Sequence, residues 1–307
     1  MLFLQSKRDF VMDKYRKPIS SLTKIVLLGS MAVMMLFVVS MLLVLVYGSR
    51  VADIHAQQLA MVLQNVLVFI APVVLLALVN RSTEQRPVAS TLWMTKGPTL
   101  KGVALVVMVY IIALPAMNYL VAWNEGLHLP QALRDVEQAM RSMEDAAKQV
   151  SDGLLATTSW GEMLLMVLLV GVLTGMGEEM FFRAGMLGSL HHGRTGRHVA
   201  VWLVAFLFSA IHMQFYGFVP RLLLGAWFGY VMLWSGEVWT PIIAHALNNS
   251  VVVVSTFLFN NHYISHNAIE TLGVAPAGEF PWLAVASAVA TAAVITAFMC
   301  KKNKRKI

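Results

Sequence analysis

Long apolar runs recur along this chain of 307 residues, and they constrain its fold more than any other feature. A helix needs about 20 apolar residues to cross a hydrocarbon layer about 30 Å thick. Runs of roughly that length cover residues 25–48, 58–79, 102–123, 163–188, 198–215, 218–235, 239–260 and 281–300. Hydrophobic residues make up 58% of the chain and charged residues 13%, which is too little polar surface for a soluble globule. The sequence therefore predicts an all-α, polytopic membrane bundle of about eight transmembrane helices.

The basic residues are distributed unevenly between the two sides of this bundle. Most of the 23 Lys and Arg residues fall on the side that holds both chain ends. Cytoplasmic loops of membrane proteins carry such an excess, so we expect both termini in the cytoplasm. Short loops and the lack of a targeting segment favour the inner membrane of a bacterium. The net charge of +7 is explained by this bias and by attraction to lipid headgroups, and it predicts no nucleic-acid partner.

The chain reads as one bundle with short additions. We expect a basic cytoplasmic segment at 1–24, three spans within 25–123, an external segment at 124–158, a core of five spans at 159–300 and a basic tail at 301–307. In the external segment, Leu133, Val136, Met140 and Met143 recur at helical spacing against a charged face. This pattern predicts an amphipathic helix on the membrane surface or over the end of the bundle. A solvated connector is the alternative interpretation.

The fourth span carries the sequence GEEMFFRAGM, which places charged groups where they are costly. Glu179 and Arg183 are four residues apart, so they share a helix face and can neutralise each other. Glu178 is rotated from them by about 100° and has no local partner. Glu178 is therefore the better candidate for a general base, while the Glu179–Arg183 pair is expected to be structural.

Two later spans add polar side chains at the same helical spacing. FSAIH places Phe208 one turn before His212, where the ring can orient the imidazole. HALNN places His245 and Asn249 on one face, with Asn248 turned away. Each of these His and Asn residues, taken alone, is equally explained as a hydrogen-bonding contact between helices.

These three motifs, in this order, resemble the signature of a known family. EExxxR at 178–183, FxxxH at 208–212 and HxxxN at 245–249 are similar to the motifs of the CPBP intramembrane proteases, also called Abi proteins. That family includes CAAX prenyl endopeptidases and bacteriocin-processing or immunity proteins, so the resemblance implies a CAAX-protease-like bundle and an endopeptidase.

The resemblance also implies a role for each matching residue. Glu178 would activate a water together with His212, and His245 and Asn249 would hold the oxyanion of the tetrahedral intermediate. Glu179, Arg183 and Phe208 would support this geometry. Peptide hydrolysis needs such a base and such donors, so the chemistry agrees with the residue types.

The cofactor, the partners and two competing functions stay open. Glu178, His212 and His245 are acceptable zinc ligands, but no HExxH motif is present and a Glu–His pair can activate water without a metal. The expected partners are the lipid bilayer and a membrane-associated peptide or protein substrate. A non-catalytic membrane scaffold is the main alternative. A proton-coupled transporter is disfavoured because the polar residues cluster in one half of the chain.

The depth of His212 conflicts with a continuous fifth span. His212 would lie about 14 residues, or ~21 Å, from the cytoplasmic start of that helix, which is deeper than Glu178 or His245. A tilted or broken helix would remove the conflict, and Gly217 and Pro220 favour irregular backbone close by.

Overall fold

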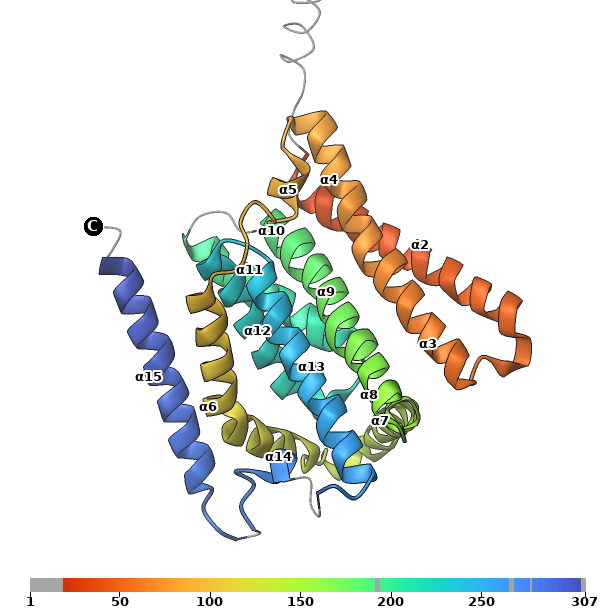
Figure 1. Cartoon of the computed structure of the whole chain (residues 1–307), viewed down its shortest axis with the longest axis vertical. Helices are drawn as coiled ribbons and strands as arrows, with labels where there is room; N and C mark the ends of the chain where they lie inside the picture. The colour runs from red at the N-terminus through yellow and green to blue at the C-terminus, as the bar shows by residue number, and fades with distance from the viewer. Residues whose placement is uncertain (1–18, 191–193, 265–267, 277, 305–307) are drawn as a thin grey trace, which may run out of the picture.

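The chain folds into a bundle of helices in a computed structural model that describes residues 19–190, 194–264, 268–276 and 278–304 (Figure 1). These residues form helices and turns and no β-strand. The first half contains α2 (Ser21–Tyr47), η1 (Gly48–Arg50), α3 (Ile54–Leu63), η2 (Gln64–Ile70), α4 (Ala71–Glu84), α5 (Val88–Thr91), α6 (Leu100–Glu125), η3 (Gln131–Leu133) and α7 (Arg134–Leu155). The second half contains α8 (Trp160–Met166), η4 (Val167–Leu173), α9 (Thr174–Glu179), η5 (Met180–Leu187), α10 (Gly188–Leu190), α11 (Arg194–Ala210), η6 (Phe215–Gly217), α12 (Phe218–Ser235), α13 (Trp239–Asn260), α14 (Ala268–Thr271) and α15 (Trp282–Lys304). The predicted all-α membrane bundle is confirmed.

Seven helices of the described part are long and apolar enough to cross a membrane. They are Ser21–Arg50, Ile54–Glu84, Leu100–Glu125, Trp160–Leu190, Phe215–Ser235, Trp239–Asn260 and Trp282–Met299. The span expected at 198–215 is instead a shorter apolar helix, Gly196–Ala210, of about 22 Å at 1.5 Å per residue. The helical backbone stops at Ala210, and a turn leads into η6. The expected fifth span is thus a short helix followed by irregular backbone.

The two described ends of the chain lie on one side of the bundle (Figure 1). The start of α2 and the end of α15 lie at the same end of the bundle, at the top of Figure 1. Most of the basic segment expected at 1–24 lies outside the described residues, as do residues 305–307 of the expected tail. Residues 301–304 of that tail continue α15 as helix.

The predicted amphipathic helix within 124–158 is present as α7, at the opposite end of the bundle (Figure 1). It contacts η6, the short helix that follows the end of α11. The Glu144 carboxylate accepts a hydrogen bond from the Tyr216 backbone N–H at 3.1 Å, and the Arg141 guanidinium lies 4.2 Å from the centre of the Tyr216 ring. These contacts favour a helix that covers the end of the bundle over a free connector.

The fourth span approaches α13 closely through small residues. A Cβ atom on Gly175 would come within 3.0 Å of the Ala246 backbone nitrogen, and one on Gly171 would overlap the Ser250 hydroxyl. Small residues four apart on facing helices let two backbones approach in this way. The contact fixes the position of α13 immediately beside His245.

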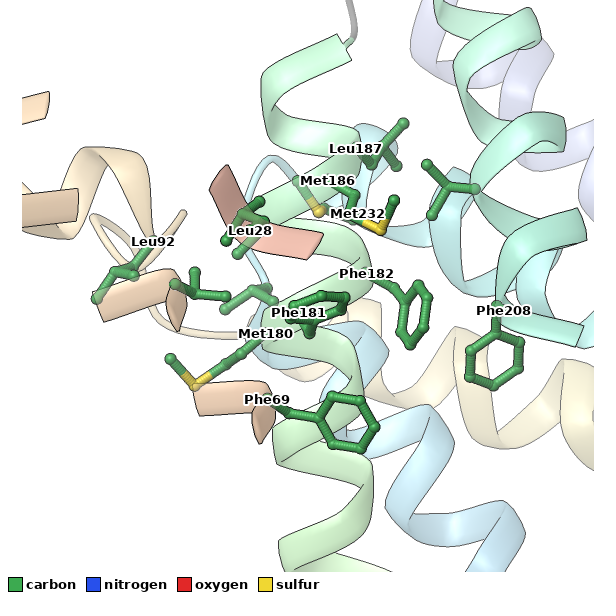
Figure 2. Packing of buried hydrophobic residues seen from close by; sticks show 14 of the residues in the cluster. Leu28, Phe69, Leu92, Met180, Phe181, Phe182, Met186, Leu187, Phe208 and Met232 are labelled. Atoms are coloured by element: carbon green, nitrogen blue, oxygen red, sulfur yellow. The ribbon is translucent and has the colours of Figure 1, made fainter. Parts of the chain in front are cut away.

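A buried apolar cluster surrounds η5 on its other sides (Figure 2). The Phe182 ring meets the Phe181 and Phe208 rings edge-on, with centroids 5.2 Å apart in both pairs. Leu28 of α2 and Met232 of α12 pack in the same cluster. Glu178 and Glu179 are therefore held inside the protein, away from lipid.

Candidate functional site

The fourth span is not a continuous α-helix. The α9 segment, which contains Glu178 and Glu179, lies between two π-helical stretches, η4 and η5. In a π-helix the backbone bonds reach one residue further than in an α-helix, and such segments occur frequently at functional sites. The change of winding on both sides of α9 alters the directions of side chains relative to a regular helix.

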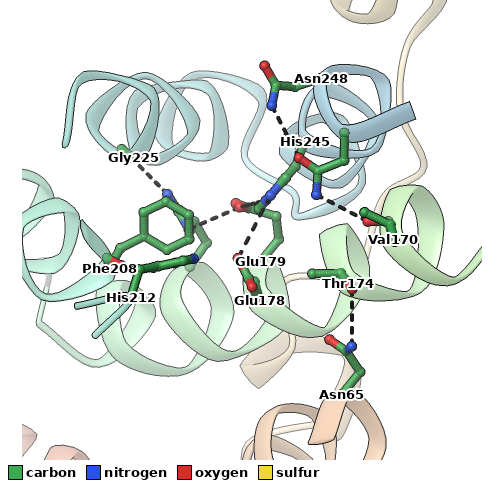
Figure 3. A network of polar contacts seen from close by, with 12 residues as sticks. Asn65, Val170, Thr174, Glu178, Glu179, Phe208, His212, Gly225, His245 and Asn248 are labelled. Atoms are coloured by element: carbon green, nitrogen blue, oxygen red, sulfur yellow. Dashed lines mark hydrogen bonds and ion pairs between the residues drawn. The ribbon is translucent and has the colours of Figure 1, made fainter. Parts of the chain in front are cut away.

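Glu179 and Arg183 form the predicted ion pair, with Glu179 Oε1 and Arg183 Nη1 2.9 Å apart and both side chains fully buried. The Arg183 Nη2 group donates a hydrogen bond of 3.0 Å to the Gly225 carbonyl oxygen of α12 (Figure 3). Its guanidinium also lies 4.6 Å from the centre of the Phe208 ring, a cation–π distance. Arg183 thus links the fourth span to α11 and α12.

His245 lies between the two carboxylates. Its Nδ1 atom is 2.8 Å from Glu179 Oε1, and its Nε2 atom is 3.8 Å from Glu178 Oε2 (Figure 3). An ionised carboxylate only accepts hydrogen bonds, so Nδ1 carries the proton and Nε2 is directed toward Glu178. The Phe228 ring stacks on the imidazole at 4.9 Å and 19°. Glu179 and Phe228 therefore fix both the tautomer and the plane of His245.

His212 lies in the turn after α11 and not inside a helix. Its Nδ1 atom is 2.7 Å from the Phe208 carbonyl oxygen, which can only accept, so Nδ1 donates and Nε2 is left as an acceptor. The Phe208 ring contacts both imidazoles, with centroids 5.2 Å from His212 and 5.9 Å from His245. The Phe208 ring thus connects His212 to the buried residues around His245.

The ion pair of Glu178 among the described residues is with His245. The joint action of Glu178 and His212 that the resemblance implies stays a prediction. Glu179 contacts His245 as well as Arg183, which the spacing within the fourth span does not predict. Spacing along one helix could not reveal this, since His245 comes from a span 66 residues away.

Asn249 is oriented by the fourth span. Its Nδ2 group donates to the Val170 carbonyl oxygen at 3.1 Å, and its Oδ1 atom accepts from Asn248 Nδ2 at 3.1 Å. Within the described part of the chain, the second N–H of the Asn249 amide is available to another acceptor. Asn249 lies one turn from His245 on α13, as the motif predicts.

Two contacts of the site have no signal in the sequence motifs. Phe228 stacks on His245, and the Gly225 carbonyl oxygen accepts from Arg183; both belong to α12. The glycines at 225 and 229 do indicate a close helix contact, since a Cβ on Gly225 would lie 3.2 Å from the Ala205 Cα atom. They could have marked α12 as a close neighbour, but they could not have identified its contacts.

The described side chains do not form the ligand set that zinc requires. Among them, no three or more His, Cys, Asp or Glu groups are placed to hold one ion. Both imidazole Nδ1 atoms donate to oxygen, so only the Nε2 atom of each ring could bind a metal.

Comparison with known proteins identifies the region that carries this site. Residues 160–251 match the family model described as type II CAAX prenyl endopeptidase Rce1-like. No curated protein and no solved structure matches the chain. The matched region runs from the start of α8 into α13 and includes Glu178, Phe208, His212, His245 and Asn249. Residues 160–251 of this chain are therefore similar to the Rce1-like family of CAAX prenyl endopeptidases.

Proposed function

We propose that the chain is an intramembrane endopeptidase that hydrolyses a peptide bond of a membrane-associated peptide or protein. The observation that carries this proposal is the placement of Glu178 and His245. Their facing atoms are 3.8 Å apart, which is too long for a direct hydrogen bond but lets one water contact both. The match of residues 160–251 to the Rce1-like family model supports the same reaction class.

The proposed reaction begins with proton transfer from this water to Glu178. The resulting hydroxide attacks the carbonyl carbon of the scissile bond, and the carbonyl electron pair moves to the oxygen. His212, with its Nε2 acceptor, assists in placing the water. Glu178 then returns the proton to the amide nitrogen as the C–N bond breaks. A general base of this kind contributes about 10²–10⁴-fold to the rate.

The donors for the oxyanion come from α13. The free N–H of Asn249 is one, and Nε2 of His245 becomes the other when the imidazole is protonated. Glu179 holds Nδ1 of His245 at 2.8 Å, which directs Nε2 into the site in either protonation state. Glu179 and Arg183 are thus positioning residues in this proposal.

The experiment uses the full chain in proteoliposomes and two internally quenched peptides. Both end in a CAAX sequence, and one carries a farnesylated cysteine. We expect cleavage by the wild type and a loss of about 10²-fold or more in Glu178→Gln. Glu125→Gln is the matched control, because Glu125 is exposed at the end of α6.

Cleavage that survives Glu178→Gln in a folded protein would refute the catalytic role of Glu178. Biological activity that persists in the Glu178→Gln variant without cleavage would instead favour the non-catalytic scaffold. The preference between the two peptides separates a prenylated substrate from other membrane-associated peptides.

We further propose that both termini face the cytoplasm of a bacterial cell. The basic residues Lys24, Arg86 and Lys101 lie beside the ends of α2, α4 and α6, and these helix ends lie at the end of the bundle that holds the start of α2 (Figure 1). The positive-inside rule assigns such an end to the cytoplasm. A reporter that fluoresces only in the cytoplasm, fused after Ile307, should be bright; a dark fusion with normal expression would reverse the orientation.

A further inference from the structure

A cavity of about 360 Å³ lies away from Glu178 and His245, at the end of the bundle where α2 begins. It is lined by residues from the start of α2, the end of α4, α5 and the end of the fourth span, which meet at the top of Figure 1. Its volume is at the lower end of the range of about 300–1,000 Å³ typical of small-molecule sites. Ala184 and Gly188 form one wall, and Trp93 packs across Gly188.

Two buried polar atoms in the cavity wall have no hydrogen-bond partner within the described protein. They are Oδ1 of Asn80 and Oγ1 of Thr91, whose residues are only 2% and 6% exposed. A buried polar atom left unpaired costs about 1–3 kcal/mol, so such atoms usually have a partner. Asn80 Oδ1 needs a donor, and the Thr91 hydroxyl can donate or accept.

The charged groups of the cavity leave one positive charge in excess. Lys24 Nζ and Glu84 Oε1 form an ion pair at 2.7 Å, with side chains only 11% and 15% exposed. Arg86 lies in the same wall, and among the described residues no carboxylate pairs with it. Its Nε donates a long hydrogen bond of 3.4 Å to the Ser90 hydroxyl, which leaves the terminal guanidinium nitrogens for a ligand.

A turn of the backbone holds Arg86 next to Asn80. Helix α4 ends at Glu84, and Gln85 adopts a left-handed conformation with φ 54°. The chain therefore turns back, and the Arg86 N–H donates to the Asn80 carbonyl oxygen at 3.4 Å. Arg86 and Asn80, which both line the cavity, are thus joined through their backbones.

We infer that this cavity binds the headgroup of a phospholipid with a singly charged phosphate and a hydroxyl donor, as in phosphatidylglycerol. The phosphate would accept from Arg86 and from the Thr91 hydroxyl, and the headgroup hydroxyl would donate to Asn80 Oδ1. An arginine guanidinium suits phosphate because its donors match the phosphate oxygens. One phosphodiester charge neutralises the excess positive charge.

The position of the cavity favours a lipid over a free phosphate ion. It lies at the ends of three candidate spans, Ser21–Arg50, Ile54–Glu84 and Trp160–Leu190, where lipid headgroups meet the protein. Ile19 and Trp93 add apolar surface to a wall that a bare ion would not need. Basic pockets between helices at this level are a known form of headgroup site.

The test measures the thermal stability of the delipidated full chain in a neutral detergent. The probes are short-chain phosphatidylglycerol, short-chain phosphatidylcholine and inorganic phosphate. A ligand that binds only the folded protein raises Tm in a saturable way. We expect phosphatidylglycerol to do so, and phosphatidylcholine to bind more weakly because its headgroup has the phosphate but no N–H or O–H donor.

The variants separate the cavity from general attraction of anionic lipid to a basic protein. Arg86→Gln should weaken the apparent affinity for phosphatidylglycerol about tenfold or more, since a hydrogen bond to a charged group is lost. Thr91→Val, which keeps the side-chain shape, should weaken it to a smaller extent. Arg81→Gln on α4 is the matched control, because Arg81 is exposed and does not line the cavity.

Three results would overturn the inference. An equal rise in Tm of wild type and Arg86→Gln with phosphatidylglycerol would show that Arg86 does not bind the lipid, which refutes the site. Equal binding of phosphatidylcholine would show that no headgroup hydroxyl donates to Asn80 Oδ1. Saturation by inorganic phosphate at the same concentrations, again dependent on Arg86, would assign the cavity to a free phosphate ion.

Discussion

Gly175→Ala should impair the proposed protease through one methyl group. A Cβ atom at this position would lie 3.0 Å from the Ala246 backbone nitrogen and 3.3 Å from the Ala246 Cα atom. These are backbone atoms of α13, so the clash cannot be relieved by a side-chain rotation. The helix itself must move, and Ala246 directly follows His245.

The expected loss of stability is small, because two effects oppose each other. Overpacking a well-packed contact costs about 1–3 kcal/mol, whereas replacing glycine by alanine inside a helix returns about 0.8–1.0 kcal/mol. The net cost is at most about 2 kcal/mol. The effect on activity should be larger, since a displacement of about 1 Å in a catalytic group can reduce the rate about 100-fold.

Two measurements on the purified chain separate these effects. Tm should fall by a few degrees, while cleavage of the quenched peptide should fall by about 100-fold. Gly29→Ala on α2 is the control, because nothing lies within 4 Å of a Cβ at that position. Full cleavage by a stable Gly175→Ala protein would refute the argument that this contact sets the position of His245.

Two further predictions concern charged groups. Arg183→Met leaves the fully buried Glu179 carboxylate without a counter-charge, so it should destabilise the protein by about 3–5 kcal/mol when unfolding is measured in detergent. The double variant Glu179→Gln/Arg183→Met should recover part of this stability. An equal loss of stability in the double variant would contradict the explanation. On α7, hydrogen bonds from the His128 ring, a backbone N–H and Arg141 hold the pKa of Glu137 at about 2, below its ordinary value of 4.5. The carboxylate therefore stabilises α7 above about pH 4.5, and this contribution is lost as the pH falls toward 2. Hydrogen-exchange protection of α7 should decline over that range in the wild type, and a Glu137→Gln variant with the same decline would argue against the cause.

Most of the bundle was predictable from the lengths of the apolar runs, because a bilayer imposes that length directly. The exception is the run at 198–215. Its apolar side chains continue through Ile211 and Met213, but the helix ends at Ala210 and Met213 adopts a positive φ of 53°. Hydropathy records the polarity of side chains and not the course of the backbone hydrogen bonds, so it cannot locate this end. Gly217 and Pro220 were the only local indications.

Helical spacing also predicted the contacts between neighbouring turns in the candidate site, but not the contacts between helices. Spacing of four residues predicts contacts within one helix, and the Glu179–Arg183 and Phe208–His212 contacts are present. Contacts between helices depend on packing. The approach of α13 through Gly175 brings His245 to the carboxylates, and no motif encodes that distance.

The position of His245 changes what the second carboxylate can do. Spacing alone separates Glu178 as a base from Glu179 as a structural partner of Arg183. Glu179 Oε1, however, is 2.9 Å from Arg183 Nη1 and 2.8 Å from His245 Nδ1, so one oxygen joins the buried cation to the imidazole. A substitution of Arg183 should therefore also displace the His245 ring and its Nε2 atom, which faces Glu178. The pair that reads as structural in the sequence is better described as the support that orients the proposed oxyanion donor, because stability and geometry at this point depend on the same oxygen atom.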